Sequence, residues 1–207
     1  MNSRKPAVWP EIVAVVCSGL LIGVIAFQWN IIDLVTPFLM IPIIFAAYGA
    51  LGISALISLG KLVLGNKRLV STYRPLTINV IAFLLVFLVP FTNIWLRANF
   101  LWYESAREKI VQQVNTGELY PNVDQRPLIA LGNDYPYVSM GGNEIIVEEH
   151  DGKKYVFFFT YRGILDNYSG FLYVPEDGDP TVFSDLNEED STQLIQYRRH
   201  WYFAAHT

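Results

Sequence analysis

The chain has 207 residues, of which 52% are hydrophobic and 16% charged, and its net charge is −4. This length allows one domain or two small ones. The charges divide unevenly, because seven basic and two acidic residues occur up to Arg97, whereas eight basic and seventeen acidic residues follow it. An acidic second half repels phosphate, which excludes nucleic acid from the expected partners. The single cysteine, Cys17, excludes a disulfide within the chain.

Three long apolar stretches in the first half carry no charged residue: Ile12–Trp29, Phe38–Leu59 and Leu76–Leu96. About 20 such residues cross the hydrocarbon core of a bilayer, and in lipid they must be helical to satisfy their backbone polar groups. The sequence therefore predicts an α-helical anchor of three spans over residues 1–97, embedded in a lipid bilayer. A separate domain is predicted over residues 98–207.

The first span follows the basic pair Arg4-Lys5, as it does in a signal peptide or a signal anchor. The stretch is long for a signal peptide, and no clear small-x-small cleavage site follows Ala26, so we favour a retained helix. Cys17 lies in the middle of this stretch and is expected to pack as a small apolar residue.

The loop charges predict an orientation. The loop 60–75 carries four basic residues and no acidic one, and the N-terminal segment carries two more bases. The positive-inside rule then places both segments in the cytoplasm. The connection 30–36 and the C-terminal domain are expected on the extracytoplasmic side of the cell (inner or plasma) membrane. Trp29 and Trp95 would lie at the outer boundary and Trp9 at the inner one, as interfacial aromatic residues do.

Small residues recur at four-residue spacing in two of the spans: Gly19 and Gly23 in the first, and Ala50, Ser54 and Ser58 in the second. Such rows let helix backbones approach closely. We interpret them as packing sites among the three helices, with a homo-oligomer or the docking of a membrane-protein partner as the alternative.

No ionisable residue lies deep in any predicted span. This pattern argues against a proton pump, an ion channel with a charged filter and a carrier with a charged midplane site. Asn79 is polar but lies close to the inner end of the third span, so we expect it at the membrane interface.

A helix is predicted over Ala98–Gly117, continuous with the third span and stopped by Gly117. Its polar flank contains Arg107, Glu108, Lys109 and Gln112, and its apolar stripe contains Ile110, Val111 and Val114.

The remaining segments predict a small antiparallel sheet, with helices on one face, in an α+β domain. A hairpin is expected at Asp151-Gly152, because both central residues of a type I′ turn need positive φ. A last helix starting at Ser184 or Asp185 would bury Leu194, Ile195 and Tyr197. The expected strands are Leu128–Leu131, Tyr137–Met140, Glu144–Glu149, Lys154–Tyr161, Phe171–Val174, the short edge piece Thr181–Phe183, and His200–Ala205.

The run Tyr155–Val174 contains the sequence Phe-Phe-Thr-Tyr-Arg-Gly, then Tyr-Ser-Gly and a further strand, and Trp201-Tyr202 follows near the end. This pattern resembles uncharacterised bacterial membrane-anchored proteins with a Phe-Phe-Thr-aromatic-Arg-Gly motif. The resemblance covers the last half of the chain. It implies a bacterial origin and brings no activity with it.

Catalytic and metal-binding patterns are weak. Val138-Ser139-Met140-Gly141-Gly142 lacks the first glycine of a nucleophile elbow, and the spacing of the three histidines supports no Ser-His-Asp site. The acidic runs Glu176–Asp179 and Glu188–Asp190 do not follow the order of an EF-hand. We therefore predict no catalytic residues, no cofactor and no metal site, and we interpret both runs as solvated acidic segments.

Arg162 follows a run of aromatic residues and precedes a polar loop. It either braces this loop by pairing with a carboxylate such as Asp166, or contacts a ligand or partner together with Asp166, Asn167 and Tyr168. Loops on a rigid sheet often carry recognition residues.

Three functions remain open at this stage. The first is a non-enzymatic interaction or accessory subunit of a membrane assembly, whose acidic domain is compatible with a basic partner. The second is a membrane-anchored sensory module that binds a small ligand or a peptide in a concave aromatic pocket near Arg162. The third, an envelope enzyme, needs a convergent His-carboxylate-hydroxyl site.

Overall fold

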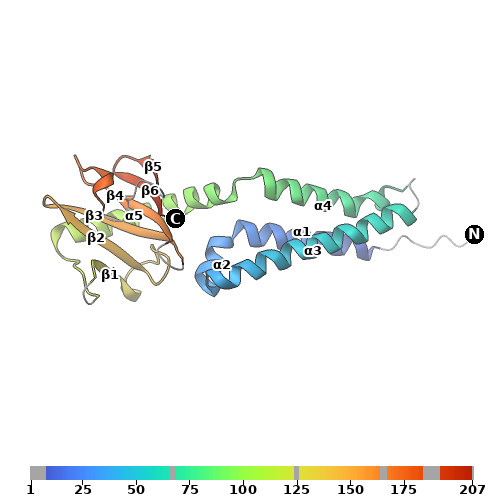
Figure 1. Ribbon diagram of the computed structural model, residues 1–207, viewed down its shortest axis with the longest axis horizontal. Coiled ribbons are helices and arrows are strands. Elements are labelled where there is room, and N and C mark those ends of the chain that lie inside the picture. The colour runs from blue at the N-terminus through green and yellow to red at the C-terminus, as the bar shows by residue number, and fades with distance from the viewer. Residues whose placement is uncertain (1–7, 66–68, 124–125, 164–166, 184–191, 207) are drawn as a thin grey trace, which may run out of the picture. The chain divides into compact units, whose positions relative to one another are not determined.

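A computed structural model describes residues 8–65, 69–123, 126–163, 167–183 and 192–206 (Figure 1). The chain forms two compact units, Met1–Trp95 and Leu96–Thr207. The first consists of helices and the second contains a six-stranded antiparallel sheet, so the expected class, a three-span helical anchor followed by an α+β domain, is confirmed.

The described residues of the first unit form four helices and the first turn of a fifth. Three of them are long and apolar enough to cross a membrane: α1 (Trp9–Ala26), α3 (Pro37–Leu64) and α4 (Val70–Leu88). The predicted connection 30–36 lies largely within a short helix, α2 (Gln28–Val35). The protein is therefore a membrane protein by the length and composition of its helices.

Helix α1 lies beside both α3 and α4 (Figure 1). An apolar cluster of Leu21, Ala47, Leu51 and Ala82 joins the three helices. Their contact surfaces are built mainly from small side chains, which is how helices pack where no hydrophobic effect drives them together.

Asn79 corrects the expectation of an interfacial residue, because it is buried at the centre of a polar cluster. Its Oδ1 accepts hydrogen bonds from the hydroxyls of Ser18 at 3.3 Å and Ser54 at 3.1 Å. Its Nδ2 donates to Ser58 Oγ at 3.0 Å, and Ser58 in turn donates to the Ser54 carbonyl. The side chain thus links α4 to α1 and α3, since an amide in an apolar setting must find partners.

The two rows of small residues lie in different surroundings. Ser54 and Ser58 are fully buried in the polar cluster, and Ala50 is half-buried. Gly19 and Gly23 differ, because a Cβ added at either position would meet nothing within 4 Å. Within the described chain, the row on α3 contacts other helices closely, whereas the glycine pair on α1 makes no such close approach.

One helix does run through Arg97, and it covers nearly all of the predicted Ala98–Gly117 helix, but the expectation that it continues the third span, Leu76–Leu96, is wrong. Helix α4 ends at Leu88, and a new helix, α5 (Phe91–Thr116), begins after Pro90. Proline lacks the N–H that would continue the ladder. The first turn of α5 contacts α2, because Thr92 Oγ1 accepts from Gln28 Nε2 at 3.1 Å and Trp95 Nε1 donates to Asn30 Oδ1 at 2.7 Å.

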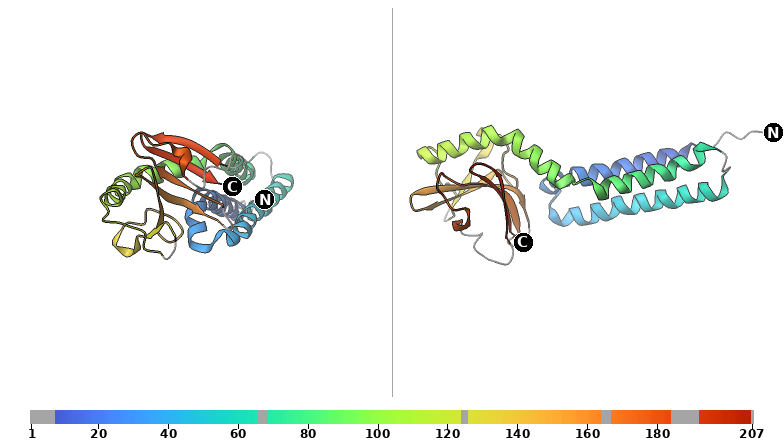
Figure 2. Two further views of the ribbon diagram at one scale, coloured as in Figure 1. Left: turned by 60° about the vertical axis from the view of Figure 1, so that its left-hand side comes forward. Right: turned by 90° about the horizontal axis from the view of Figure 1, so that it is seen from above.

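The second unit is a sheet with the strand order β1-β2-β3-β4-β6-β5, in which every described neighbouring pair is antiparallel. Helix α5 lies across one of its faces (Figure 2). The expected hairpin joins β2 and β3, with φ of 51° at Asp151 and 73° at Gly152. The strands are β1 (Leu128–Ala130), β2 (Glu144–His150), β3 (Lys153–Arg162), β4 (Tyr168–Tyr173), β5 (Thr192–Arg198) and β6 (Trp201–His206).

Three local expectations are corrected. Tyr137–Met140 is an irregular segment, and residues 180–182 form a 3₁₀ turn, η2 (Pro180–Val182). The predicted last helix is wrong where it is described, since residues 192–198 form β5, with Ile195 half exposed. Its expected start at Ser184 or Asp185 lies outside the described residues.

Strand β3 is buried on both faces, because Tyr155 to Thr160 are all at most 4% exposed. On one face Phe158 lies under α5, and Phe171 packs against Phe100 of that helix at 5.0 Å between ring centroids. On the other face Phe157 stacks on Phe183 at 5.6 Å. The segment after β4 thus covers the face that α5 does not, which explains why three consecutive phenylalanines are needed.

Gly170, in the Tyr-Ser-Gly part of the sequence motif, is required by packing. A Cβ at this position would lie 2.2 Å from the Phe158 carbonyl oxygen and 2.5 Å from the Phe157 ring. The register of β3 on β4 also shifts next to this point, between Phe159 and Tyr161. No residue with a side chain fits here without moving the neighbouring strand.

Candidate functional site

Arg107 corrects the expectation of a polar flank on the helix after Arg97, because it is 1% exposed and lies between α5 and the sheet. Its Nε and Nη2 donate to the Val138 carbonyl at 3.2 and 2.9 Å. Nη2 also donates to Asn99 Oδ1 at 2.7 Å. The guanidinium carbon lies 4.9 Å from the centroid of the Phe171 ring and 5.8 Å from that of Phe158.

Among the described residues, no carboxylate pairs with Arg107. Burial lowers the pKa of its guanidinium to about 9, an effect that the nearby Tyr103 partly offsets. The charge is held by carbonyl oxygens and aromatic faces instead, which are the interactions that a planar guanidinium makes best. Arg107 therefore fixes α5 and the segment around Val138 to the sheet.

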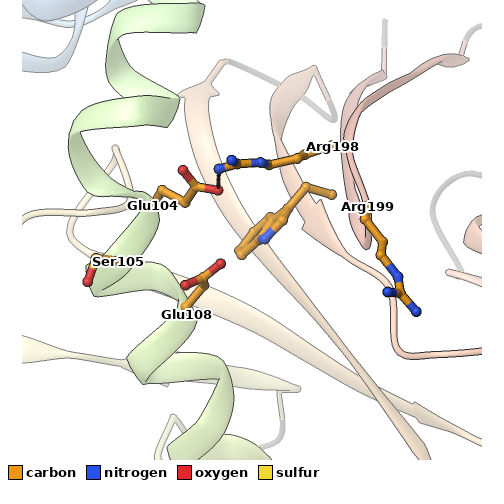
Figure 3. Close-up of a pocket in the computed structure, with 6 residues that line it drawn as sticks. Glu104, Ser105, Glu108, Arg198 and Arg199 are labelled. Atoms are coloured by element: carbon orange, nitrogen blue, oxygen red, sulfur yellow. Dashed lines mark hydrogen bonds and ion pairs between the residues drawn. The ribbon is translucent and has the colours of Figure 1, made fainter.

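An open hollow of about 400 Å³ lies between α5 and the β5–β6 hairpin (Figure 3). Helix α5 contributes Glu104 and Glu108, whose side chains point toward the strands, and Ser105, whose side chain points away from them. The hairpin contributes Arg198, Arg199 and Trp201. The two glutamates lie on one helix face because residues four apart do.

The charges at this hollow are only partly compensated. Arg198 forms an ion pair with Glu104, and Arg199 pairs with the exposed Glu176 at 2.9 Å. The Glu108 side chain is exposed and forms no ion pair with another described residue. Partial burial raises the pKa of the Tyr173 phenol, and the charges of Glu176 and Glu108 raise it further. The hollow therefore offers a carboxylate that is available to a cation.

The residues predicted around Arg162 have a different environment. Arg162 Nη1 pairs with Glu144 Oε2 at 2.6 Å, and its guanidinium lies over the Phe159 ring. The arginine is thus held to the start of β2, and the alternative partner, Asp166, lies outside the described residues. Asn167 accepts a backbone hydrogen bond from Gly163 at 2.8 Å, and Tyr168 packs against Phe157 at 5.4 Å. Arg162 does not line the hollow.

Three of the other groups that the sequence offers for catalysis, Ser139, His150 and His200, have structural partners. Ser139 is buried, accepts from the Phe159 N–H and donates to the Glu144 carbonyl. His150 Nε2 lies 3.1 Å from Glu148 in the β2–β3 hairpin, and His200 Nδ1 lies 3.2 Å from the Val174 carbonyl. Within the described ranges no three His, Cys, Asp or Glu side chains converge as a metal site would require.

No protein-family model, curated protein or solved structure matches this chain. The site must therefore be interpreted from its own chemistry.

Sequence reasoning missed the two features that organise this domain. Arg107 falls on the same helical stripe as Phe100, Ile110 and Val114, and this spacing indicated an inward-facing position. The hollow had no local signal, because the residues that line it, such as Glu108 and Arg199, are far apart in the chain.

Proposed function

We propose that this chain is a multi-pass protein of the cell membrane that acts as an interaction or accessory subunit of a membrane assembly. Its N-terminus would be cytoplasmic and its C-terminal domain extracytoplasmic. The observation that carries the proposal is the open, charged hollow of α5 and the β5–β6 hairpin, in which Glu108 is available to a partner. The acidic composition of the domain supports a partner with a basic contact segment.

Charge reversal at the hollow tests this function. Glu108→Arg in the full chain should abolish co-purification of a partner in mild detergent after crosslinking in cells. Glu118→Arg is the matched control, since Glu118 is also exposed and near the same helix but outside the hollow. If the wild-type protein purifies only as a monomer without a crosslinked protein, the interaction role is refuted.

The proposed orientation rests on the basic loop 60–75 and is tested separately. In a Cys17→Ser background, a cysteine replacing the exposed Tyr120 should react with a membrane-impermeant maleimide in intact cells. A cysteine replacing Leu64, at the end of α3, should react only after the membrane is opened. The reverse labelling pattern would show the opposite topology, and the interaction test would be unaffected.

A binding or sensory module is the second candidate, because the hollow has room for one side chain of a peptide or a small cation. Titration of the purified protein with a lysine-containing peptide, followed by tryptophan fluorescence, to which Trp201 in the hollow contributes, distinguishes this role. A saturable change in fluorescence that is lost in Glu108→Gln would favour the binding or sensory role over the accessory role.

A further inference from the structure

The outer face of helix α5 carries an apolar stripe with no protein cover among the described residues. We call Ile94, Ala98, Leu101 and Trp102 the α5 stripe; they follow one another at the three- and four-residue spacing of one helix face. Ile94 is 54% exposed, Leu101 59% and Trp102 82%. The opposite face of α5, with Phe100, is the one that packs on the sheet.

The α5 stripe is confined to the first half of the helix. Farther along the same face, the exposed residues are Ser105, Lys109 and Gln112, which are all polar. The apolar side chains therefore occur only near the end of the helix that follows α4. Only two residues lie between the end of α4 at Leu88 and the start of α5 at Phe91.

We propose that the α5 stripe is a membrane-contact surface that lies in the lipid headgroup layer, on the side of the bilayer that holds the C-terminal domain. Chain connectivity keeps the stripe near the end of α4, where Phe87 and Leu88 are 77% and 69% exposed. Tryptophan suits this layer because its ring is apolar and its N–H is polar. Arg97, also exposed beside the stripe, can extend its charge to the headgroups.

The geometry sets a condition on this contact. Ile94 and Trp102 are separated by about 12 Å along the helix axis, at about 1.5 Å per residue. One headgroup layer is only about 5–8 Å thick. All four side chains can share that layer only if this part of α5 is strongly inclined to the bilayer normal, as interfacial amphipathic helices are.

A lipid surface fits this stripe better than a second copy of the chain does. A stable dimer needs about 800 Å² and about 20–30 residues on each partner, whereas the stripe has four residues spread over about two turns of helix. Contact with a bilayer has no such requirement, because the three candidate spans already hold the protein there.

The test uses the full chain with Cys17→Ser, reconstituted in vesicles of phosphatidylcholine and phosphatidylglycerol. A nitroxide is attached at Trp102→Cys or, as the matched control on the same helix face, at Lys109→Cys. Both sites are exposed, so neither change removes core packing. Collision with oxygen, which is soluble in lipid, is compared with collision with a water-soluble nickel complex.

We expect oxygen to collide several-fold more often than nickel with the label at position 102, and the reverse at position 109. Equal or greater access of nickel at position 102 would place the stripe in water and overturn the proposal. Spin–spin broadening at position 102 that disappears on dilution with unlabelled protein would assign the stripe to a second copy, which also overturns it.

Discussion

Replacement of Arg107 by methionine should change how the stability of the C-terminal domain depends on pH. Methionine keeps a long, flexible side chain in the same space but removes the charge. Burial lowers the pKa of Arg107 from its much higher ordinary value to about 9 in the folded protein. A base whose pKa is lowered on folding destabilises the fold while it is charged, and this cost disappears as the pH rises through the folded pKa.

The size of the effect follows from this difference. At neutral pH the charged guanidinium therefore carries a net cost to stability, although it donates hydrogen bonds to Val138 and Asn99. Above pH 9 the free energy of unfolding of the wild type should rise by about 1.4 kcal/mol per pH unit relative to that of Arg107→Met. Between pH 8 and pH 10 we therefore expect a relative gain of about 1.4 kcal/mol.

The assay is guanidinium unfolding of the full chain in detergent at pH 8 and pH 10, followed by near-ultraviolet circular dichroism. Tyrosines such as Tyr173 titrate in both proteins, so their effect cancels in the difference between wild type and variant. Parallel stabilities of the two proteins over this range would refute the reasoning. They would mean that the guanidinium is not desolvated in the folded state.

Three further changes test the packing of the two units. Asn79→Ala should lower the stability of the helical unit by about 2 kcal/mol, because three hydrogen bonds between helices are lost at about 0.6 kcal/mol each. Thermal unfolding in detergent measures this loss. Thr77→Ala is the control and should have little effect, because the Thr77 hydroxyl bonds within its own helix. Phe183→Ala should cost about 3–5 kcal/mol in chemical denaturation, against almost nothing for the exposed Tyr120→Ala; equal effects would show that residue 183 covers no core. Gly170→Ala should cost about 3 kcal/mol or more, since its Cβ would meet the backbone of β3; a variant with normal near-ultraviolet circular dichroism and stability would contradict the close approach of the strands.

The membrane half was predictable because its signal is local and strong. A charge-free stretch such as Phe38–Leu59 has one stable form in lipid, and α3 contains it entirely. The β2–β3 hairpin was equally predictable from the sequence, because Asp151-Gly152 supplies the positive φ that its turn requires. In both cases a few neighbouring residues determine the structure.

The predictions that were wrong concern residues whose structure depends on contacts distant in sequence. Residues 192–198 have helix-compatible spacing of apolar residues, but β6 provides a hydrogen-bonding edge that makes them a strand. Asn79 was placed at the interface from its position in the span, whereas its partners Ser18 and Ser54 come from two other helices. The charged hollow depends in the same way on the pairing of β5 with β6.

The strand order also has a consequence for the time at which the domain can form during synthesis. Strands β1 to β4 are neighbours in the sheet in the order in which they leave the ribosome, so each can pair as soon as it is made. Strand β5 is made next, but it lies at the edge of the sheet and is joined to β4 only through β6, which is made after it. Strand β5 therefore cannot join the sheet before β6 has been made. When β6 (Trp201–His206) pairs with both β4 and β5, it completes the sheet and the hollow in a single step.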